Sequence, residues 1–95
     1  MSVTNAPQSL DGALVLSAAP AVAGQSGYDY ETGASVPIHY YAIAQYPSDE
    51  PRAYLFAVSD THQVVGDSLW DSLAEAAQVA LDCGHVTHAF ELPNA

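Results

Sequence analysis

The sequence predicts an α+β domain in which an antiparallel sheet of four or five strands carries one principal helix, at about residues 73–83, on one face. Three observations predict this fold class. Short runs of β-branched and aromatic residues alternate with Pro-, Gly- and Asp-containing turns, as in strands joined by hairpins. One segment has helical periodicity with capping signals at both ends. The chain has 95 residues, of which 49% are hydrophobic, and this suffices for one small core.

The N-terminal part of the chain predicts a tail and then a strand. Residues 1–11 are polar and mixed, so we expect a flexible tail, followed by a single domain over residues 12–95. Residues 13–18 are apolar and predict the first strand, which ends before Pro20. This apolar segment is similar to the core of a secretion signal, but no Lys or Arg precedes it. We therefore expect a cytoplasmic protein.

The next two segments differ sharply in composition. Residues 24–35 contain three Gly and two Ser, so we expect a loop. Residues 36–46 are rich in β-branched and aromatic side chains and predict one long strand. Because both faces of this strand carry apolar residues, we expect it to be central in the sheet.

Two hairpins and the helix follow. We expect a turn over 47–51, a strand over 53–58, a second turn over 59–62 and a short strand over 63–65 that ends at Gly66 and Asp67. Ser72 and Glu75 form a capping-box pattern at the helix start, and Gly84 supplies the end signal.

The apolar side chains of these elements predict the core. Residues 86–92 alternate in hydropathy and predict a final strand. Trp70 is expected to cover the end of the sheet beside the helix start. The other predicted core residues are Leu14, Leu16, Ile38, Tyr40, Ile43, Leu55, Val58, Val65, Leu73, Ala77, Ala80, Leu81, Val86 and Phe90.

The charge balance excludes several classes of function. Eleven acidic residues stand against one basic residue, Arg52, so the formal net charge is −10. Binding to nucleic acid or to anionic membranes requires Lys and Arg, so we expect neither. No apolar run is long enough for a membrane span. An uncompensated negative field attracts basic proteins, so we expect a protein partner with a basic surface.

The residues that could carry chemistry do not form a recognisable catalytic or metal-binding set. Cys83, His85 and His88 have a metal-like spacing, but histidines three apart on a strand point to opposite faces. His62 with Asp60 and Asp67 could supply a general base, yet no nucleophile is associated with them by spacing. We therefore expect no catalytic residue, no metal and no cofactor.

The predicted interaction surface combines tyrosines with carboxylates. Tyrosine supplies contact area in protein interfaces, and loops carry recognition residues. The alternative is that these tyrosines fold back onto the sheet. The candidate partner-binding residues are Tyr28, Asp29, Tyr30, Glu31, Asp49 and Glu50, with Asp60 and Asp67 as a second choice.

One stretch of the chain resembles a known arrangement. Residues 53–84 predict a hairpin followed by a helix that starts Ser72-Leu73-Ala74-Glu75-Ala76. This order is similar to the hairpin-then-helix of HicB-type antitoxins and other small α+β inhibitor domains.

Two classes of function are favoured over a structural or accessory subunit. The first class is an acidic protein-interaction module: an inhibitor, an immunity protein or antitoxin, or a phage counter-defence protein. Four features favour it: the short chain, the predicted lack of a catalytic set, the charge of one sign and the Tyr-rich loop. The alternative is a small enzyme or small-molecule-binding domain that uses His39, His62 or His88 with carboxylates. The sequence also leaves a homodimer open, because an exposed sheet face or edge can pair with a second copy.

Overall fold

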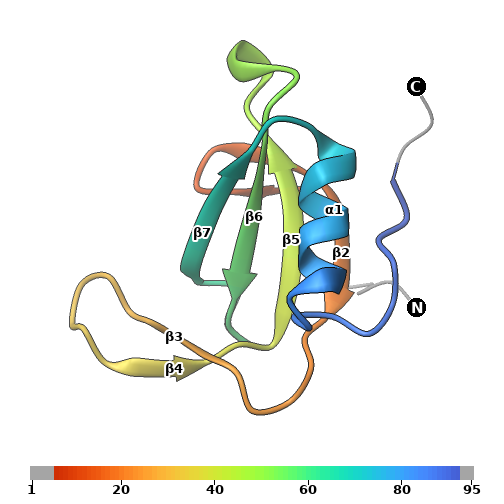
Figure 1. Ribbon diagram of the computed structural model, residues 1–95. Coiled ribbons are helices and arrows are strands. Elements are labelled where there is room, and N and C mark those ends of the chain that lie inside the picture. Colours follow the sequence, from red (N-terminus) through yellow and green to blue (C-terminus); the bar gives the residue numbers. More distant parts are fainter. Residues whose placement is uncertain (1–5, 93–95) are drawn as a thin grey trace.

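The computed structural model describes residues 6–92, which form a five-stranded antiparallel sheet, one α-helix packed on it and a separate two-stranded hairpin (Figure 1). The strand order in the main sheet is β1-β2-β5-β6-β7. The predicted fold class is therefore confirmed. The elements are β1 (Ser9–Leu10), β2 (Ala13–Pro20), β3 (Ser26–Tyr28), β4 (Ser35–Pro37), β5 (Tyr40–Gln45), the 3₁₀ turn η1 (Pro47–Asp49), β6 (Ala53–Val58), β7 (Val64–Trp70) and α1 (Leu73–Asp82).

Strands β1 and β2 form one edge of the sheet. The predicted strand over 13–18 is present as β2 and extends to Pro20. Strand β1 lies in the segment predicted as a flexible tail, where Leu10 is buried and pairs with Ala13. Residues 9–10 are thus part of the sheet rather than of a tail, and residues 1–5 lie outside the described residues. The register between β2 and β5 shifts at Leu16, and such a bulge bends a strand.

The segment predicted as a loop over 24–35 contributes instead to the β3–β4 hairpin. Tyr28 pairs with Ser35, and the backbone N–H of Gly33 donates to the carbonyl of Asp29 at 2.7 Å. Gly27 comes so close to β7 that a Cβ there would lie 2.2 Å from the carbonyl oxygen of Val65. Only glycine fits this approach, so Gly27 holds the hairpin against β7.

The long strand predicted over 36–46 is divided in two because the chain changes partners. Strand β4 pairs with β3, whereas β5 pairs with β2 and β6 and is central, as expected. Strand β6 matches the prediction over 53–58. Strand β7 does not end at Gly66 and Asp67 but continues to Trp70, since its residues keep partners on β6.

Helix α1 begins as predicted and ends one residue early. The side chain of Ser72 accepts a hydrogen bond from the backbone N–H of Glu75 at 3.1 Å, and Glu75 Oε1 accepts from the N–H of Asp71. Ala76 and Ala80 are fully buried, which lets the helix lie close to the sheet. None of the described residues form a helix long and apolar enough to cross a membrane.

Residues 86–92 do not form the predicted strand. Val86 makes an isolated bridge with Ala21, and the chain then continues without regular structure. Val86 and Phe90 are nevertheless buried. The apolar alternation therefore reflects side chains inserted beside the helix and not a strand ladder.

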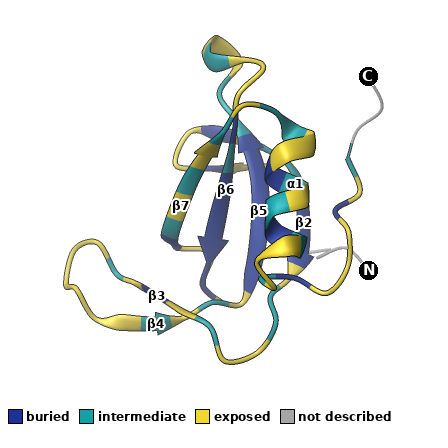
Figure 2. Cartoon of the chain, viewed as in Figure 1, coloured by how far each residue is buried: buried dark blue, intermediate teal, exposed yellow. Residues whose placement is uncertain are grey.

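Apolar side chains form a buried cluster on each face of the sheet. Strands β5 and β6 are buried along most of their length (Figure 2). The core on the side of α1, here the helix-side core, contains Ile43, Leu55 and Val65, with Trp70 packed against it. The core on the opposite face, here the back core, contains Tyr40 and Val58. Among the predicted core residues, the prediction is wrong for Leu14, which is 50% exposed. Five others are half-buried: Leu16, Ile38, Leu73, Ala77 and Leu81.

Candidate functional site

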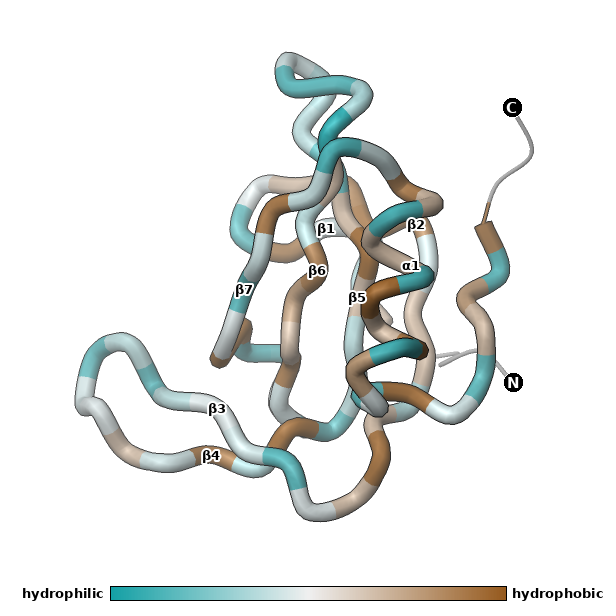
Figure 3. The backbone as a smooth tube through the Cα atoms, viewed as in Figure 1, coloured by the Kyte–Doolittle hydropathy of each residue, from teal (hydrophilic) through white to brown (hydrophobic). Residues whose placement is uncertain are grey.

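The structure separates the predicted partner-binding residues into two ends of the molecule. Tyr28 to Glu31 lie at the β3–β4 hairpin, whose tip is hydrophilic (Figure 3). Asp49 and Glu50 lie in the connection between β5 and β6, at the opposite end of the sheet (Figure 1). Asp60 lies in the turn between β6 and β7, and Asp67 is exposed on β7. The predicted set therefore does not form one surface.

An open cleft of about 450 Å³ lies beside the hairpin tip. We call it the acidic cleft because two carboxylates, those of Asp11 and Glu31, lie on its lining. The hairpin, the β1–β2 turn and the β6–β7 turn each contribute to it. The lining residues are Pro7, Ser9, Leu10, Asp11, Tyr30, Glu31, His62, Gln63 and Val64.

Tyr30 is the aromatic residue of this cleft and is 62% exposed. Its pKa is raised, first by partial burial of the phenol and then by the negative charges of Asp67 and Asp11. These two carboxylates thus act on the same phenol, although one is on β7 and the other between β1 and β2. Of the predicted residues, Tyr30 and Glu31 line this cleft and the charge of Asp67 acts on Tyr30, whereas Asp11 was not predicted.

The side chain of Asp29 is hydrogen-bonded to the backbone of the hairpin itself. Its Oδ1 accepts hydrogen bonds from the backbone N–H groups of Glu31 at 2.8 Å and Thr32 at 3.3 Å. The N–H of Glu31, followed by the side chain of Gln63, lowers the pKa of the Asp29 carboxyl. Asp29 therefore shapes the tip that presents Tyr30.

His62, which lines the cleft, is paired with a core tyrosine. The hydroxyl of Tyr40, which is fully buried, lies 2.8 Å from Nδ1 of His62. Within residues 6–92, Asp11 and His62 are the non-glycine residues with positive φ, at 49° and 65°. Both line the acidic cleft, and backbone strain of this kind concentrates at functional sites.

The opposite end of the molecule carries Arg52, the sole Lys or Arg in the sequence. Its guanidinium pairs with Asp49, and this hydrogen bond raises the pKa of Arg52, with a smaller effect from Asp71. Arg52 therefore partly neutralises the negative charge of the Asp49–Glu50 turn. No Lys or Arg neutralises the carboxylates of the acidic cleft in this way.

A second cavity, of about 230 Å³, lies on the helix side of the sheet and is here called the helix-side cavity. Its lining residues are Tyr41, Leu55, Ala57, Gly66, Asp67, Ser68 and His85. Asp67 pairs with Phe56 of the back core, so its carboxylate faces the other side of the sheet. His85 is half-buried and stacks against Tyr41. His88 bonds to its neighbour Thr87 instead. The sequence pattern alone gave no indication of the pairing between Tyr41 and His85, which are 44 residues apart.

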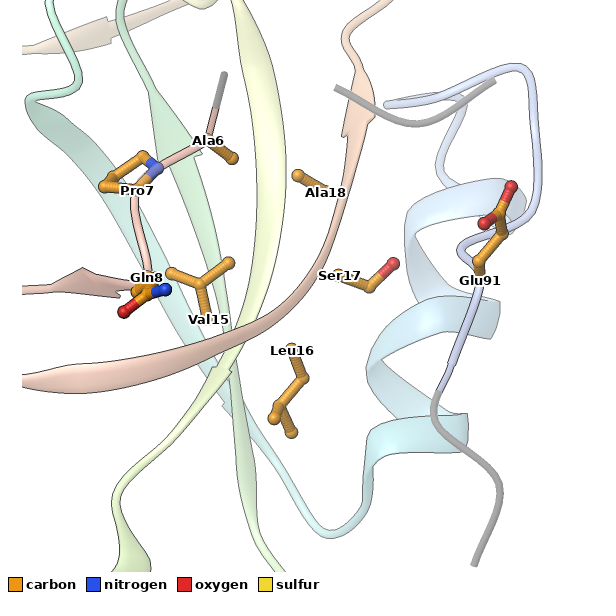
Figure 4. A pocket seen from close by; sticks show the side chains of 8 residues that line it. All are labelled: Ala6, Pro7, Gln8, Val15, Leu16, Ser17, Ala18 and Glu91. Atoms are coloured by element: carbon orange, nitrogen blue, oxygen red, sulfur yellow. The ribbon is translucent and has the colours of Figure 1, made fainter. Parts of the chain in front are cut away.

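A third hollow, of about 270 Å³, lies along β2. Figure 4 shows Ala6 and Pro7 on one side of β2 and Glu91 on the other. Its lining is mostly aliphatic, with Gln8, Ser17 and Glu91 as the polar members. This combination indicates no particular chemistry.

Comparisons with family models, with curated proteins and with solved structures found no match to this chain. The hairpin-then-helix order over residues 53–84 is present as β6, β7 and α1.

Proposed function

We propose that this protein is a small acidic protein-interaction module, of the inhibitor, immunity, antitoxin or phage counter-defence type, that binds a basic partner at the acidic cleft. The observation that carries the proposal is the placement of Tyr30 among carboxylates from three separate parts of the chain: Asp11, Glu31 and Asp67. A Lys or Arg side chain of a partner would find both charge and an aromatic face there.

The charge distribution supports the same surface. The net charge is −10, and the single Arg is held by Asp49 at the far end of the sheet. A basic partner approaching the cleft therefore meets no competing Lys or Arg. Such one-signed fields raise the rate of association more than they raise affinity.

Two exposed tyrosines also support a protein-binding surface at the hairpin. Tyr28 and Tyr30 are 64% and 62% exposed, so neither folds back into the core. Tyrosine is enriched among interface residues that contribute most to binding energy. The hairpin thus offers contact area that carboxylates cannot supply.

Affinity capture tests the proposal. The wild-type protein and a Tyr28→Ser/Tyr30→Ser variant are immobilised and exposed, at low salt, to a lysate of the source organism. We expect basic proteins to be retained by the wild type and lost from the variant and on raising the salt concentration. Retention of the protein itself alone would overturn the proposal and leave a homodimer. Equal retention of basic proteins by both baits would overturn binding through the hairpin tyrosines.

A further inference from the structure

Strand β7 forms one edge of the main sheet, opposite the edge formed by β1 (Figure 1). Within residues 6–92 it pairs with β6 alone, so part of its backbone N–H and C=O groups point out of the sheet. The β3–β4 hairpin reaches this edge at Val65, where a Cβ on Gly27 would lie 2.2 Å from the carbonyl oxygen. The stretch from Gly66 to Trp70, here called the β7 edge, continues beyond the hairpin.

The contact at Gly27 shows which residues of the β7 edge point outward. The carbonyl of Val65 faces β3 and hence away from β6. The C=O of one residue and the N–H of the next point in opposite directions across a trans peptide, so the N–H of Gly66 points toward β6. From Gly66 onward the pairing with β6 is regular, and successive residues alternate in direction. Asp67 and Leu69 therefore present their N–H and C=O groups outward.

The hydrogen bonds on the other side of β6 give the same assignment. The N–H of His39 donates to the carbonyl of Val58 at 2.8 Å, so Val58 points toward β5. By alternation, Ala57 points toward β7, where its partner is Gly66. Gly66 is thus hydrogen-bonded to β6, and the next residue, Asp67, points away from it.

The β7 edge lacks most features that prevent strand pairing. Proteins protect sheet edges with Lys, Pro, bulges or a covering segment. The β7 edge contains neither Lys nor Pro, and the irregularity in its pairing with β6 lies before Gly66. Its one charged residue is Asp67, which is exposed on the same face as Leu69. A carboxylate here disfavours an acidic strand and favours one with Lys or Arg opposite.

A second copy of this chain fits the edge poorly. Two-fold antiparallel pairing must match outward residues with outward residues, and the hairpin covers Val65. Asp67 would then lie opposite Asp67, Leu69 or Asp71 of the second copy. Two of these registers place carboxylates directly opposite each other, and the Leu69 register places the two Asp67 side chains on a diagonal of about 7–8 Å. Each copy also carries a net charge of −10.

From this geometry we propose that the β7 edge binds an extended segment of a basic protein partner as an additional antiparallel strand. The backbone of Asp67 and Leu69 exchanges hydrogen bonds with this segment. An apolar residue of the segment lies opposite Leu69, and a Lys or Arg two positions later lies opposite Asp67. The antiparallel direction continues that of the sheet and is the more stable per residue.

This inference rests on the proposed function for the basic character of the partner. It extends the proposed contact from the acidic cleft along β7, because the charge of Asp67 acts on Tyr30 at the cleft. Backbone pairing would supply affinity, and the charge at Asp67 would select the partner.

Amide hydrogen exchange in the free protein tests the assignment of the edge. We expect the amides of Asp67 and Leu69 to exchange about tenfold or more faster than those of Ser68 and Trp70, which bond to β6. Equal protection of all four amides would overturn the proposal. Protection of Asp67 and Leu69 that rises with protein concentration would indicate a second copy on the edge and would also overturn it.

Titration with capped peptides tests strand addition. The probe is Thr-Val-Thr-Arg-Thr-Val, and its controls carry Glu in place of Arg, or N-methyl groups on the first Val and on Arg. We expect the probe to bind saturably and to protect the amides of Asp67 and Leu69. Both controls should bind about tenfold more weakly or less, because one reverses the charge and the other removes the donors that face β7. Absence of saturable binding, or equal binding of either control, would overturn the proposal.

Two charge reversals test the role of Asp67. Asp67→Lys should weaken binding of the Arg peptide about tenfold, whereas Asp82→Lys, an equal change of net charge at the end of α1, should have a much smaller effect. Equal losses would show that the peptide responds to net charge alone and would overturn the proposal.

Capture from a lysate separates this proposal from the proposed function. Leu69→Pro removes an outward N–H without removing a bond to β6, and Leu69→Thr keeps that N–H. We expect basic proteins to be lost from the first variant and retained by the second. Equal retention by both would overturn binding at the β7 edge and leave the acidic cleft as the binding surface. A wild-type protein that retains no basic protein would overturn the proposed function, and the peptide titration would still decide whether the β7 edge adds a strand.

Discussion

The buried hydroxyl of Tyr40 lies 2.8 Å from Nδ1 of His62, a residue with φ of 65° in the turn between β6 and β7. This pair joins the back core to the acidic cleft. The hydroxyl is inaccessible in the core, whereas His62 is exposed at the cleft. The position of His62 therefore depends on a core residue.

Removing His62 should destabilise the protein through Tyr40. We expect His62→Ala to lower the free energy of unfolding by about 1–3 kcal/mol, because the buried hydroxyl loses its partner. In a Tyr40→Phe background the same change should cost less, giving an interaction energy of about 1 kcal/mol in a double-mutant cycle. Urea unfolding measures all four proteins, and strictly additive losses would show that the two side chains are not coupled.

Gly27 should be necessary for the position of the hairpin. In Gly27→Ala the new Cβ would lie 2.2 Å from the carbonyl oxygen of Val65, so the hairpin must move away from β7. We expect faster amide hydrogen exchange in β3 and β4 and a loss of about 1–3 kcal/mol in stability. Gly66→Ala is the control, since its Cβ would meet Ala57 Cβ at 3.4 Å. Equal effects of both substitutions would contradict the role given to Gly27.

The burial of two neighbouring residues on α1 predicts that an enlarged side chain at one and a shortened side chain at the other both destabilise the protein. Ala80 is fully buried, so Ala80→Leu should overpack the helix–sheet contact and cost about 1–3 kcal/mol. Leu81 is only half-buried, so Leu81→Ala should cost about 2 kcal/mol, the low end of the range for a core leucine. Chemical unfolding measures both. An Ala80→Leu variant as stable as the wild type would show that the helix face is assigned wrongly.

Asp29 predicts a local dependence on pH. Backbone and side-chain hydrogen bonds lower its pKa below the ordinary value of 3.8 in the folded protein. The hairpin turn should therefore gain stability from this carboxylate above pH 3.8, and should lose it as the pH falls through the lower, folded pKa. A carboxyl titration by nuclear magnetic resonance measures the pKa of Asp29. The control is Asp29→Asn, which keeps an acceptor oxygen. An Asp29 that titrates at or above 3.8 would contradict this.

Local signals in the sequence predicted the parts of the fold that depend on local interactions. The capping of α1 by Ser72 and Glu75 involves residues three apart and was predicted correctly. The end of β7 was predicted wrongly. Gly66 and Asp67 disfavour strands locally, and their pairing with β6 is a long-range effect that local signals do not reveal. The strand predicted over residues 86–92 is absent for a different reason. The apolar alternation of this segment buries Val86 and Phe90, but its backbone forms only an isolated bridge and no strand pairing.

The candidate site was predictable only in part. Exposure of Tyr28 and Tyr30 could be expected from a Gly-rich segment, whereas the approach of Asp11 and Asp67 to Tyr30 depends on the fold. The Asp49–Arg52 pair, three residues apart, was within reach of sequence reasoning. The bonds between Gln25 and His85, 60 residues apart, were not.

The dissociation constant of the captured basic partner, measured for two double variants of equal charge, tests the central claim most directly. Glu31→Gln/Asp67→Asn removes two carboxylates at the cleft, and Glu50→Gln/Asp71→Asn removes two near Arg52. We expect the first pair to weaken binding about tenfold or more at low salt, with the difference shrinking as salt is raised, and the second to have a much smaller effect. Equal losses from the two pairs would mean that net charge alone attracts the partner and that the acidic cleft is not its binding site.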